Sequence, residues 1–297
     1  MTSTHLFGGI EAGGTKFNCI IASGPDHIIQ EARIPTTTPE ETLGKTIEFF
    51  RPFVAARQID SIGIASFGPV DIAPDSPTYG FITATPKPYW SNTDVCGTIQ
   101  RALDVRTAIT TDVNGAALGE FQWGASQGCD PSLYLTVGTG IGGGYLVDGK
   151  PLTGLLALEM GHIRIPHDFA RDPFPGNCPF HGDCFEGLAN GPAIQKRFGA
   201  RGESIRDDDP FWDVEAGYIA SALANYILTL SPKRIVLGGG VMAREYLFPK
   251  VRRKVQDLLN GYVVHPSILT DIDGYIVPPA LGSRSGSLGA IALAQMG

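Results

Sequence analysis

Two glycine turns that carry hydroxyl residues, each between two short apolar strands, constrain this 297-residue chain most. The first turn, Glu11–Lys16, joins predicted strands at 6–10 and 18–22. The second, Gly138–Gly144, joins predicted strands at 133–137 and 145–147. Around these turns, strands alternate with helical patterns twice along the chain. The sequence therefore predicts two α/β domains.

Helix and loop signals agree with this division. Thr38 precedes Pro39, and Glu41 stands three residues after Thr38, which predicts a helix start with a capping box. This helix is expected to run to about Arg57, with Leu43, Ile47, Phe50 and Val54 on its buried stripe. The other expected helices are 93–103, 114–121, 214–230, 246–259 and 286–295; the other expected strands are 28–34, 59–65, 107–111, 234–237 and 275–277.

The expected domain division is discontinuous in sequence. The first domain is predicted to contain residues 1–116 and the C-terminal helix, about 284–297. The second domain is predicted to contain residues 117–283, with an inserted irregular loop at about 159–191. A second long loop is expected at 67–90, where proline and glycine dominate.

The composition disfavours a polyanion as the main partner. The formal net charge is −7 and the pI is about 5.3, whereas binding to nucleic acid requires a basic face. No apolar run approaches the length of a membrane span, so no membrane partner is expected. Five cysteines, an odd number, fit reduced thiols better than a disulfide framework. These features predict a cytoplasmic protein that acts on a small molecule.

Each glycine turn taken alone is also compatible with a simple hairpin. The segment 138–144 has the spacing of a dinucleotide fingerprint, but a strand pattern follows it instead of a helix, and the chain has no Walker motif. Backbone N–H groups in such turns can surround phosphate oxygens. A third glycine run, Gly238–Gly240, ends a strand and precedes Val241 and Met242, which form a suitable apolar surface for adenine.

These motifs occur together in one known family. Glu11–Lys16 resembles the first phosphate motif of the actin-like sugar kinases, 137–144 resembles their second phosphate motif, and 235–240 resembles their adenosine motif. With the loop residues described below, the chain resembles the ROK family of kinases and repressors, and within it the bacterial fructokinases, over about residues 7–294. The resemblance implies an α/β fold of two actin-like (ribonuclease H-like) domains flanking a nucleotide and sugar cleft.

The same resemblance implies the reaction, which is ATP-dependent phosphorylation of a hexose, with D-fructose and fructose 6-phosphate as the expected pair. It implies Mg²⁺ bound with ATP. The first motif usually opens with Asp, and Glu11 stands there in this chain, which leaves open how Mg²⁺ is handled. The resemblance assigns these residues to the nucleotide site: Gly13, Gly14, Thr15, Lys16, Gly138, Thr139, Gly140, Pro192, Gly238, Gly239 and Gly240.

Asp112 is the candidate catalytic base. It follows the predicted strand 107–111, and ligand sites in α/β domains gather at the carboxyl ends of strands. The alternative is that Asp112 caps a helix that begins near Asn114. The resemblance implies that Asp112 accepts the proton of the sugar hydroxyl. It also places Thr111 at the sugar, where glucose-specific relatives often have Asn, and this favours another hexose.

Four histidines and cysteines converge on the loop 159–191. They follow the pattern His-x15-Cys-x2-His-x2-Cys and are His162, Cys178, His181 and Cys184. Two thiolates and two imidazoles form a usual tetrahedral Zn²⁺ set, and four protein ligands predict a structural metal. The alternative is chance clustering. The family pattern is commonly Cys-x-Cys-x4-Cys, and His181 makes this chain resemble the fructokinase-type members.

The resemblance implies sugar contacts from the same loop. Glu159 opens a Glu-x-Gly-His segment, and Glu186 follows Cys184 by two residues. Residues 68–71 and 85–90 resemble the sugar loops of the first domain, and Trp90 is expected to shape the sugar pocket, although a tryptophan is more often part of a core.

Other functions remain possible at this point. A ROK repressor would need an N-terminal DNA-binding segment, for which the residues before Glu11 leave no room. A non-catalytic sugar-binding protein is disfavoured by Asp112 and both glycine turns. Glucose, mannose or N-acetylmannosamine are the alternative substrates, and a homodimer is expected because family members are often dimers.

Overall fold

The computed structural model describes residues 5–296, which divide into two compact units. The first unit contains the chain up to Gly128, residues 144–157, and the chain from Ala280 onward. The second unit contains residues 129–143 and 158–279. The first unit thus includes 117–128 and 144–157, which the sequence assigned to the second domain.

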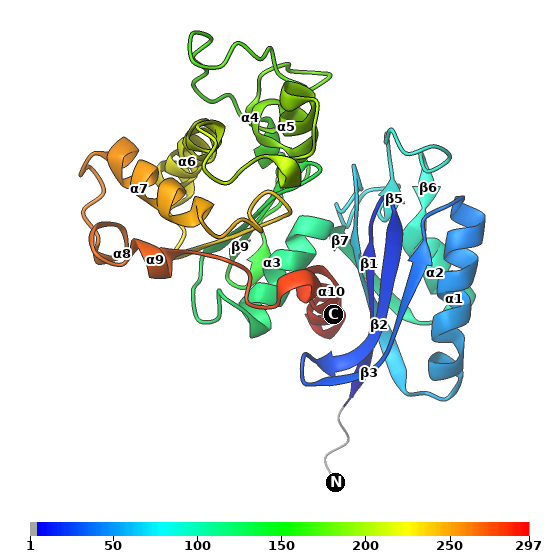
Figure 1. The fold of residues 1–297 in the computed structure, drawn as a ribbon. Helices are drawn as coiled ribbons and strands as arrows, with labels where there is room; N and C mark the ends of the chain where they lie inside the picture. Colours follow the sequence, from blue (N-terminus) through cyan, green and yellow to red (C-terminus); the bar gives the residue numbers. More distant parts are fainter. Residues whose placement is uncertain (1–4, 297) are drawn as a thin grey trace. The chain divides into compact units, whose positions relative to one another are not determined.

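The first unit is built on a five-stranded sheet with the order β3-β2-β1-β4-β7 (Figure 1). The pairs β1–β2 and β2–β3 are antiparallel, whereas β1–β4 and β4–β7 are parallel. The strands are β1 (Leu6–Ala12), β2 (Lys16–Gly24), β3 (His27–Pro35), β4 (Ile59–Ser66) and β7 (Arg106–Thr111). The helices of this unit are α1 (Pro39–Ala55), α2 (Val95–Leu103), α3 (Asp112–Trp123) and α10 (Ser285–Met296), and a small sheet pairs β5 (Phe81–Ile82) with β6 (Thr93–Asp94).

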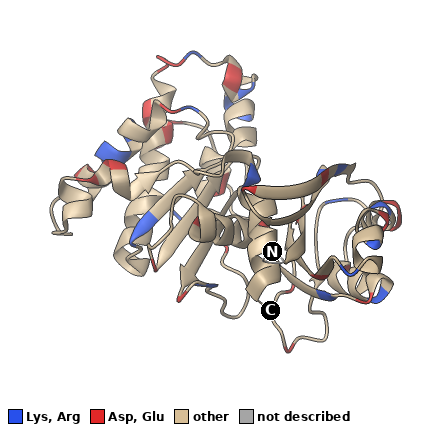
Figure 2. Cartoon of the chain, turned by 90° about the horizontal axis from the view of Figure 1, so that it is seen from below, with Lys and Arg blue, Asp and Glu red and all other residues tan. Residues whose placement is uncertain are grey.

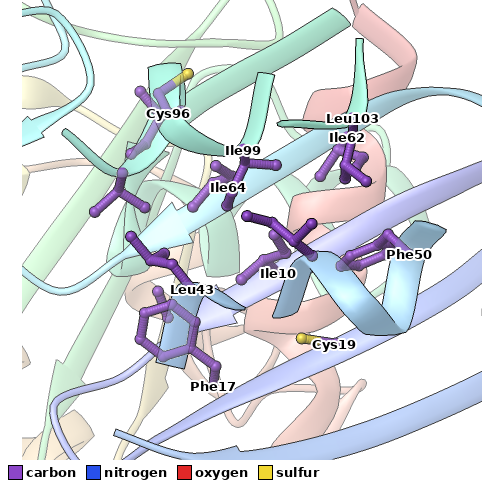
Figure 3. Close-up of a cluster of buried hydrophobic side chains, with 14 of the residues drawn as sticks. Ile10, Phe17, Cys19, Leu43, Phe50, Ile62, Ile64, Cys96, Ile99 and Leu103 are labelled. Atoms are coloured by element: carbon purple, nitrogen blue, oxygen red, sulfur yellow. The ribbon is translucent and has the colours of Figure 1, made fainter. Parts of the chain in front are cut away.

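One apolar core lies between this sheet and the helices α1 and α2. Figure 3 shows Ile10 and Ile64 from the strands meeting Leu43 and Phe50 from α1 and Ile99 from α2. The predicted stripe on α1 is confirmed, because Leu43, Ile47 and Phe50 are buried and Val54 packs against the same cluster. Full burial of each such side chain contributes roughly 1.5–3 kcal/mol.

The start of α1 differs in one detail from the prediction. The Thr38 hydroxyl accepts from the N–H of Glu41, as a helix cap does. The Glu41 carboxylate does not complete a capping box, because it accepts from the Thr37 hydroxyl and the Lys45 ammonium, each at 2.6 Å. The neighbouring hydroxyl and the i,i+4 cation therefore displace the expected contact with Thr38.

The helices α3 and α10 pack together, and α10 also lies against β1 and β4 (Figure 1). Glycines allow this close approach. A Cβ on Gly289 would stand 1.6 Å from the carbonyl oxygen of Gly115, and a Cβ on Gly63 would stand 2.0 Å from that of Ala290. Only glycine fits at these two crossings, so the C-terminal helix is an integral part of the unit that begins the chain.

The second sheet has the order β10-β9-β8-β11-β12, with β8, β11 and β12 parallel. Its strands are β8 (Ser132–Val137), β9 (Ile141–Val147), β10 (Lys150–Pro151), β11 (Arg234–Gly238) and β12 (Ile276–Val277). The helices of the second unit are α4 (Phe185–Ala189), α5 (Gly191–Phe198), α6 (Phe211–Leu230), α7 (Leu247–Leu259), α8 (Pro266–Leu269) and α9 (Ile272–Tyr275). Helices α6 and α7 pack against each other.

Short elements interrupt the two loops that the sequence predicted. The segment 67–90 contains β5, and the segment 159–191 contains α4 and a 3₁₀ turn, Met160–His162. The glycine turns are shorter than expected, because β1 continues to Ala12 and β9 already begins at Ile141. Within residues 5–296, none of the helices combines the length and apolar character that a bilayer crossing requires.

Glu120 is a fully buried carboxylate that ties α3 to the C-terminal segment. Its Oε1 accepts from the N–H of Leu281 at 3.0 Å and the hydroxyl of Ser285 at 2.7 Å. Its Oε2 accepts from the N–H groups of Ala125 at 2.7 Å and Ala280 at 3.0 Å. Each of these four donors thereby has an acceptor in the fully buried Glu120 carboxylate.

Substitution Glu120→Ala should destabilise the protein by about 2–4 kcal/mol, because four donors, of which the Ser285 hydroxyl is buried, lose a charged acceptor. Chemical denaturation followed by circular dichroism measures this change. Glu48→Ala, at an exposed position of α1, is the matched control and should be close to neutral. An equally small effect of both substitutions would contradict the role of Glu120.

Candidate functional site

The first glycine turn lies between β1 and β2, and Thr36 holds it. The N–H of Gly13 donates to the carbonyl of Lys16 at 2.9 Å. The buried Thr36 hydroxyl donates to the carbonyl of Gly13 at 2.7 Å, and the Thr36 N–H donates to the carbonyl of Thr15 at 3.0 Å. Gly14 has open space where a Cβ would stand. The turn is therefore fixed from behind by β3 and its following residue.

Glu11 stands at the end of β1, beside this turn. Its Oε2 accepts from the amide of Asn18 at 2.8 Å. Its carboxylate packs so closely on Gly286 of α10 that a Cβ there would lie 2.6 Å from Oε1. The longer side chain is thus accommodated by a glycine on the C-terminal helix.

Asp112 is exposed at the carboxyl end of β7 and forms the first residue of α3. The interpretation of Asp112 as the helix cap is wrong, because the Thr111 hydroxyl accepts from the N–H of Asn114 and is the N-cap. The Asp112 Oδ1 accepts from the N–H of Val113 at 2.9 Å. Since β4 pairs with β7 through Ser66 and Thr111, Asp112 follows the common carboxyl edge of parallel strands.

The second glycine turn, 138–140, is attached to the junction of α4 and α5. Glu186 Oε2 accepts from the N–H of Ile141 at 2.8 Å. The Asn190 amide donates to the carbonyl of Thr139 at 3.1 Å, and the Gly191 N–H donates to the carbonyl of Gly138 at 2.7 Å. Three residues within the six-residue stretch 186–191 therefore fix the backbone of the glycine turn. We call this stretch the junction.

A pocket of about 640 Å³ opens beside this turn in the second unit. Four of the residues predicted to bind the nucleotide line it, namely Gly138, Thr139, Pro192 and Gly240. The other lining residues are Gly191, Ile194, Gln195, Arg201, Gly202, Glu203, Trp212, Val241, Ala243 and Arg244. Sequence segments more than 50 residues apart thus meet at one cavity, which we call the junction pocket.

The third glycine run shapes the pocket from behind. Gly239 has φ +94°, and a Cβ there would stand 2.3 Å from the carbonyl oxygen of Val137. The N–H of Val241 donates to the same carbonyl at 3.0 Å. Gly238 is packed against Tyr134 and Pro279, so it contributes to packing. Val241 lines the pocket as the predicted apolar surface, whereas Met242 is buried and is not among the lining residues.

The donor atoms of His162, Cys178, His181 and Cys184 lie within 4.8 Å of one another. Cys178 Sγ is 3.8 Å from His162 Nδ1 and 3.6 Å from His181 Nδ1, and Cys184 Sγ is 3.6 Å from His162 Nδ1. A tetrahedral Zn²⁺ with usual bond lengths places sulfur and nitrogen ligands about 3.6 Å apart. The donor set and these three sulfur–nitrogen distances therefore fit a tetrahedral Zn²⁺ site.

The loop that carries this cluster is docked on α5 and α6 through Asp172. The buried Asp172 carboxylate accepts from Arg197 Nη2 at 2.9 Å and from the Tyr218 hydroxyl at 2.7 Å. These partners lower the pKa of Asp172 against the opposing effect of burial, which is the largest single influence. His167 Nε2 donates to the Asp172 carbonyl at 2.9 Å, and its Nδ1 lies 3.3 Å from Asp183, between two of the cluster residues.

Glu159 and Glu186 flank the cluster at its two ends. Partial burial raises the pKa of Glu159, against the opposing effect of His162 and with a further increase from Glu186. The two carboxylates are therefore close enough to influence each other. Glu186 differs from its predicted role in that one oxygen is used by the N–H of Ile141.

Trp90 does not line an open pocket. It is fully buried, packs against Phe17 and Phe67, and donates from Nε1 to the carbonyl of Thr37 at 2.8 Å. The alternative, that Trp90 is part of a core, is confirmed, because its ring packs between β2 and the 67–90 segment, and its role in shaping a sugar pocket stays a prediction. Its neighbour Tyr89 is the exposed aromatic residue of this segment.

Comparison with known proteins decides the family. A model of the ROK family matches residues 7–296. The chain belongs to the ROK family. The fructokinase of Zymomonas mobilis subsp. mobilis is 47% identical, with 97% of this chain and 96% of the relative covered. The fructokinase of Streptococcus mutans serotype c is 44% identical, with 98% of each chain covered.

A solved ROK structure confirms the fold class. The ROK hexokinase of Thermus thermophilus is 26% identical, superimposes with a TM-score of 0.80, and is matched over 98% of both chains. The predicted fold class of two actin-like α/β domains is thus confirmed, and so is the recognition of the family.

Sequence reasoning missed several residues that build the site. Thr36 pins the first glycine turn, Asn190 supports the second, and Asp172 and Arg197 dock the cluster loop. Asn190 had a usable signal, since Asn directly before Gly-Pro is a typical helix N-cap, and its side chain does accept from the N–H of Ala193. The other residues lie far from their partners in sequence and give no local signal.

Substitution Glu186→Ala should speed amide exchange at Ile141 about tenfold or more, because this N–H loses its carboxylate acceptor. Hydrogen exchange of the isolated protein, read at 138–141, measures the effect. Glu186→Gln keeps an acceptor oxygen and should retain most of the protection, and Glu245→Ala, exposed in the same unit, should change nothing. Unchanged exchange in Glu186→Ala would refute the support of the turn by Glu186.

Proposed function

We propose that this protein is an ATP-dependent sugar kinase that phosphorylates D-fructose to fructose 6-phosphate. The observation that carries the proposal is the junction pocket, where the second phosphate motif, the adenosine motif and Pro192 line one cavity. Backbone N–H groups of a glycine turn suit phosphate oxygens, and the apolar Val241 suits a purine base. A chemistry that needs both features is the binding of a nucleoside triphosphate.

The choice of sugar is supported by the relatives. Two ROK proteins named fructokinase share 44–47% of their residues with this chain over nearly their whole length. Glucokinases of the family are more distant, such as that of Thermotoga maritima at 27% identity. Thr111, in place of the Asn frequent in glucose-specific relatives, agrees with this order. Glucose, mannose and N-acetylmannosamine are the alternative substrates.

In the proposed mechanism Asp112 is the base. Its exposed carboxylate accepts the proton of the sugar hydroxyl while that oxygen attacks the γ-phosphorus of ATP, the bond from this phosphorus to the bridging oxygen breaks, and ADP leaves. Glu159 and Glu186 accept hydrogen bonds from sugar hydroxyls, and Thr111 adds a contact beside the base. Gly13–Lys16 and Gly138–Gly140 bind phosphate oxygens of ATP, and Glu11 is the residue that would hold Mg²⁺, which would offset the charge of the triphosphate.

We assign Zn²⁺ a structural role at His162, Cys178, His181 and Cys184. Four protein ligands leave no position for substrate, so the ion would order the loop between Glu159 and Glu186. The odd cysteine number and the acidic net charge support a cytoplasmic location, and the resemblance to the family supports a homodimer.

A DNA-binding role has less support. Figure 2 shows Lys and Arg scattered along the chain, with Asp and Glu among them. The basic stretch 250–254 on α7 is partly neutralised, since Arg252 pairs with Asp273 at 2.9 Å and Lys254 with Asp213 at 3.1 Å. This distribution favours a small substrate over a polyanion.

A coupled ADP-release assay with MgATP and fructose, glucose, mannose or N-acetylmannosamine tests the proposal. Turnover should be fastest with fructose. Asp112→Asn should lower kcat by about 10²–10⁴-fold with ATP binding retained, because only the base is lost. Asp60→Asn, exposed in the same unit, is the control and should retain full activity. No turnover with any of these sugars would refute the proposed kinase activity. Faster turnover with another hexose would refute fructose as the preferred substrate.

Metal analysis tests the zinc assignment. The purified protein should contain about one zinc ion per chain, and Cys184→Ser should lose both the ion and thermal stability, since zinc binding contributes to folding. Cys129→Ser changes a cysteine outside the cluster and should retain the ion. Zinc-free wild-type protein with an unaltered melting temperature would contradict a structural role.

A further inference from the structure

The outer wall of the junction pocket comes from a segment that belongs to none of the glycine motifs. Arg201, Gly202 and Glu203 line the pocket, and the chain then continues through the buried Ile205 and the exposed charged residues 206–208 to Asp209. We call 201–209 the wall segment. It contains only one short 3₁₀ turn, Gly202–Ser204, so its own backbone hydrogen bonds hold it weakly.

Arg244 connects this wall segment to the opposite wall. It follows the adenosine motif and itself lines the pocket beside Ala243. Its Nη2 donates to the carbonyl of Gly202, and its Nη1 donates to Asp207 Oδ1 at 2.8 Å. Its guanidinium lies over the ring of Trp212, 4.6 Å from the ring centre. One side chain therefore contacts the wall segment at two residues and the start of α6 at a third.

Trp212 completes the attachment at the other end of the wall segment. The ring is buried at the start of α6, and Nε1 donates to the carbonyl of Arg206 at 2.9 Å. The Trp212 N–H donates to the carbonyl of Asp209 at 3.1 Å. Arg244 and Trp212 together hold the wall segment near both of its ends, and they stabilise each other by the cation–π contact.

We propose that Arg244 is a positioning residue for the nucleotide, because it holds the wall segment in the conformation that closes the junction pocket. This inference rests on the proposed binding of ATP in that pocket. Without Arg244 the wall segment would have to be ordered when the nucleotide binds, and the entropy lost then would weaken ATP binding.

The geometry distinguishes positioning from direct recognition of the base. Both terminal nitrogens of Arg244 are engaged with the wall segment, and one face of the guanidinium is covered by Trp212. Loss of Arg244 should therefore lower the affinity for all nucleoside triphosphates by a similar factor. A direct hydrogen bond to the base edge would instead change the preference for ATP over GTP and CTP.

The three contacts of Arg244 differ in weight. The Asp207 side chain is 70% exposed, so its ion pair with Arg244 is screened by water and contributes little. The Arg244 side chain itself is 17% exposed, and its contacts with Gly202 and Trp212 are the sheltered ones. Asp207→Asn should therefore be much milder than loss of the guanidinium.

The test compares Arg244→Gln, Arg244→Lys, Asp207→Asn and Arg206→Gln in the full-length protein. Arg206 is the matched control, because its side chain is exposed on the same segment and pairs with Asp208. The readouts are KM for ATP, KM for the sugar, kcat, and direct binding of a non-hydrolysable ATP analogue without sugar. A proteolysis rate at 201–209 without nucleotide reports the wall segment itself.

Arg244→Gln should lower the affinity for ATP and for the analogue about tenfold or more. Its kcat and its KM for the sugar should stay within about twofold of wild type. Proteolytic cleavage at 201–209 should be faster than in wild type. Arg244→Lys should have an intermediate nucleotide affinity, since lysine keeps the positive charge but lacks the planar guanidinium that donates to two acceptors at once. Arg206→Gln and Asp207→Asn should stay within about threefold.

Unchanged nucleotide affinity in Arg244→Gln, or a changed ratio of ATP to GTP and CTP, would overturn the inference. A parallel loss of kcat and both affinities with a lower melting temperature would also overturn it, as general damage to the fold. If the wild-type protein neither binds the analogue nor phosphorylates a sugar, the proposed function fails. If Arg244→Gln is cleaved at 201–209 no faster than wild type, the role of Arg244 in holding the wall segment is refuted, whatever the result with nucleotide.

Discussion

The second unit depends on the attachment of the glycine turn 138–140 to the junction 186–191. The turn has no side chains large enough to pack, so hydrogen bonds from outside must fix its path. Glu186, Asn190 and Gly191 supply them within a few residues of chain. Because this junction begins two residues after Cys184, the order of the histidine and cysteine cluster and the order of the turn are linked. The proposed sugar carboxylate Glu186 and the proposed phosphate turn thus share one hydrogen bond.

The first unit solves the same problem by tertiary packing. Thr36 fixes the first glycine turn, and α10 returns from the end of the chain to lie on β1 and β4. Glycines 63, 115 and 289 permit backbone contacts there, and Glu120 secures the entry to α10 with buried hydrogen bonds. The carboxyl end of β7, where Asp112 stands, is held by β4 beside it. In both units, the strands position the glycine turns that the proposed function assigns to phosphate.

Local patterns made much of this structure predictable. The apolar stripe on α1, the strands around both glycine turns and the cluster of His162, Cys178, His181 and Cys184 all follow from residues that are close in sequence. Differences from the prediction have two causes. Trp90 is part of the core because it packs against Phe17, which is distant in sequence, and against Phe67. Glu41 does not form the predicted capping box because two near neighbours, Thr37 and Lys45, compete for its carboxylate. Thr36 and Arg244 donate hydrogen bonds to residues in distant segments, and no local sequence pattern predicts these contacts.

The central claim is that a nucleotide binds in the junction pocket between the second glycine turn and the wall segment. Crystals grown with a non-hydrolysable ATP analogue and fructose test it most directly, through the electron density of the bound molecule. We expect the purine of the analogue beside Val241 and Ala243, and the density of its phosphates at Gly138 and Thr139. Well-defined nucleotide density at another place on the second unit would contradict it.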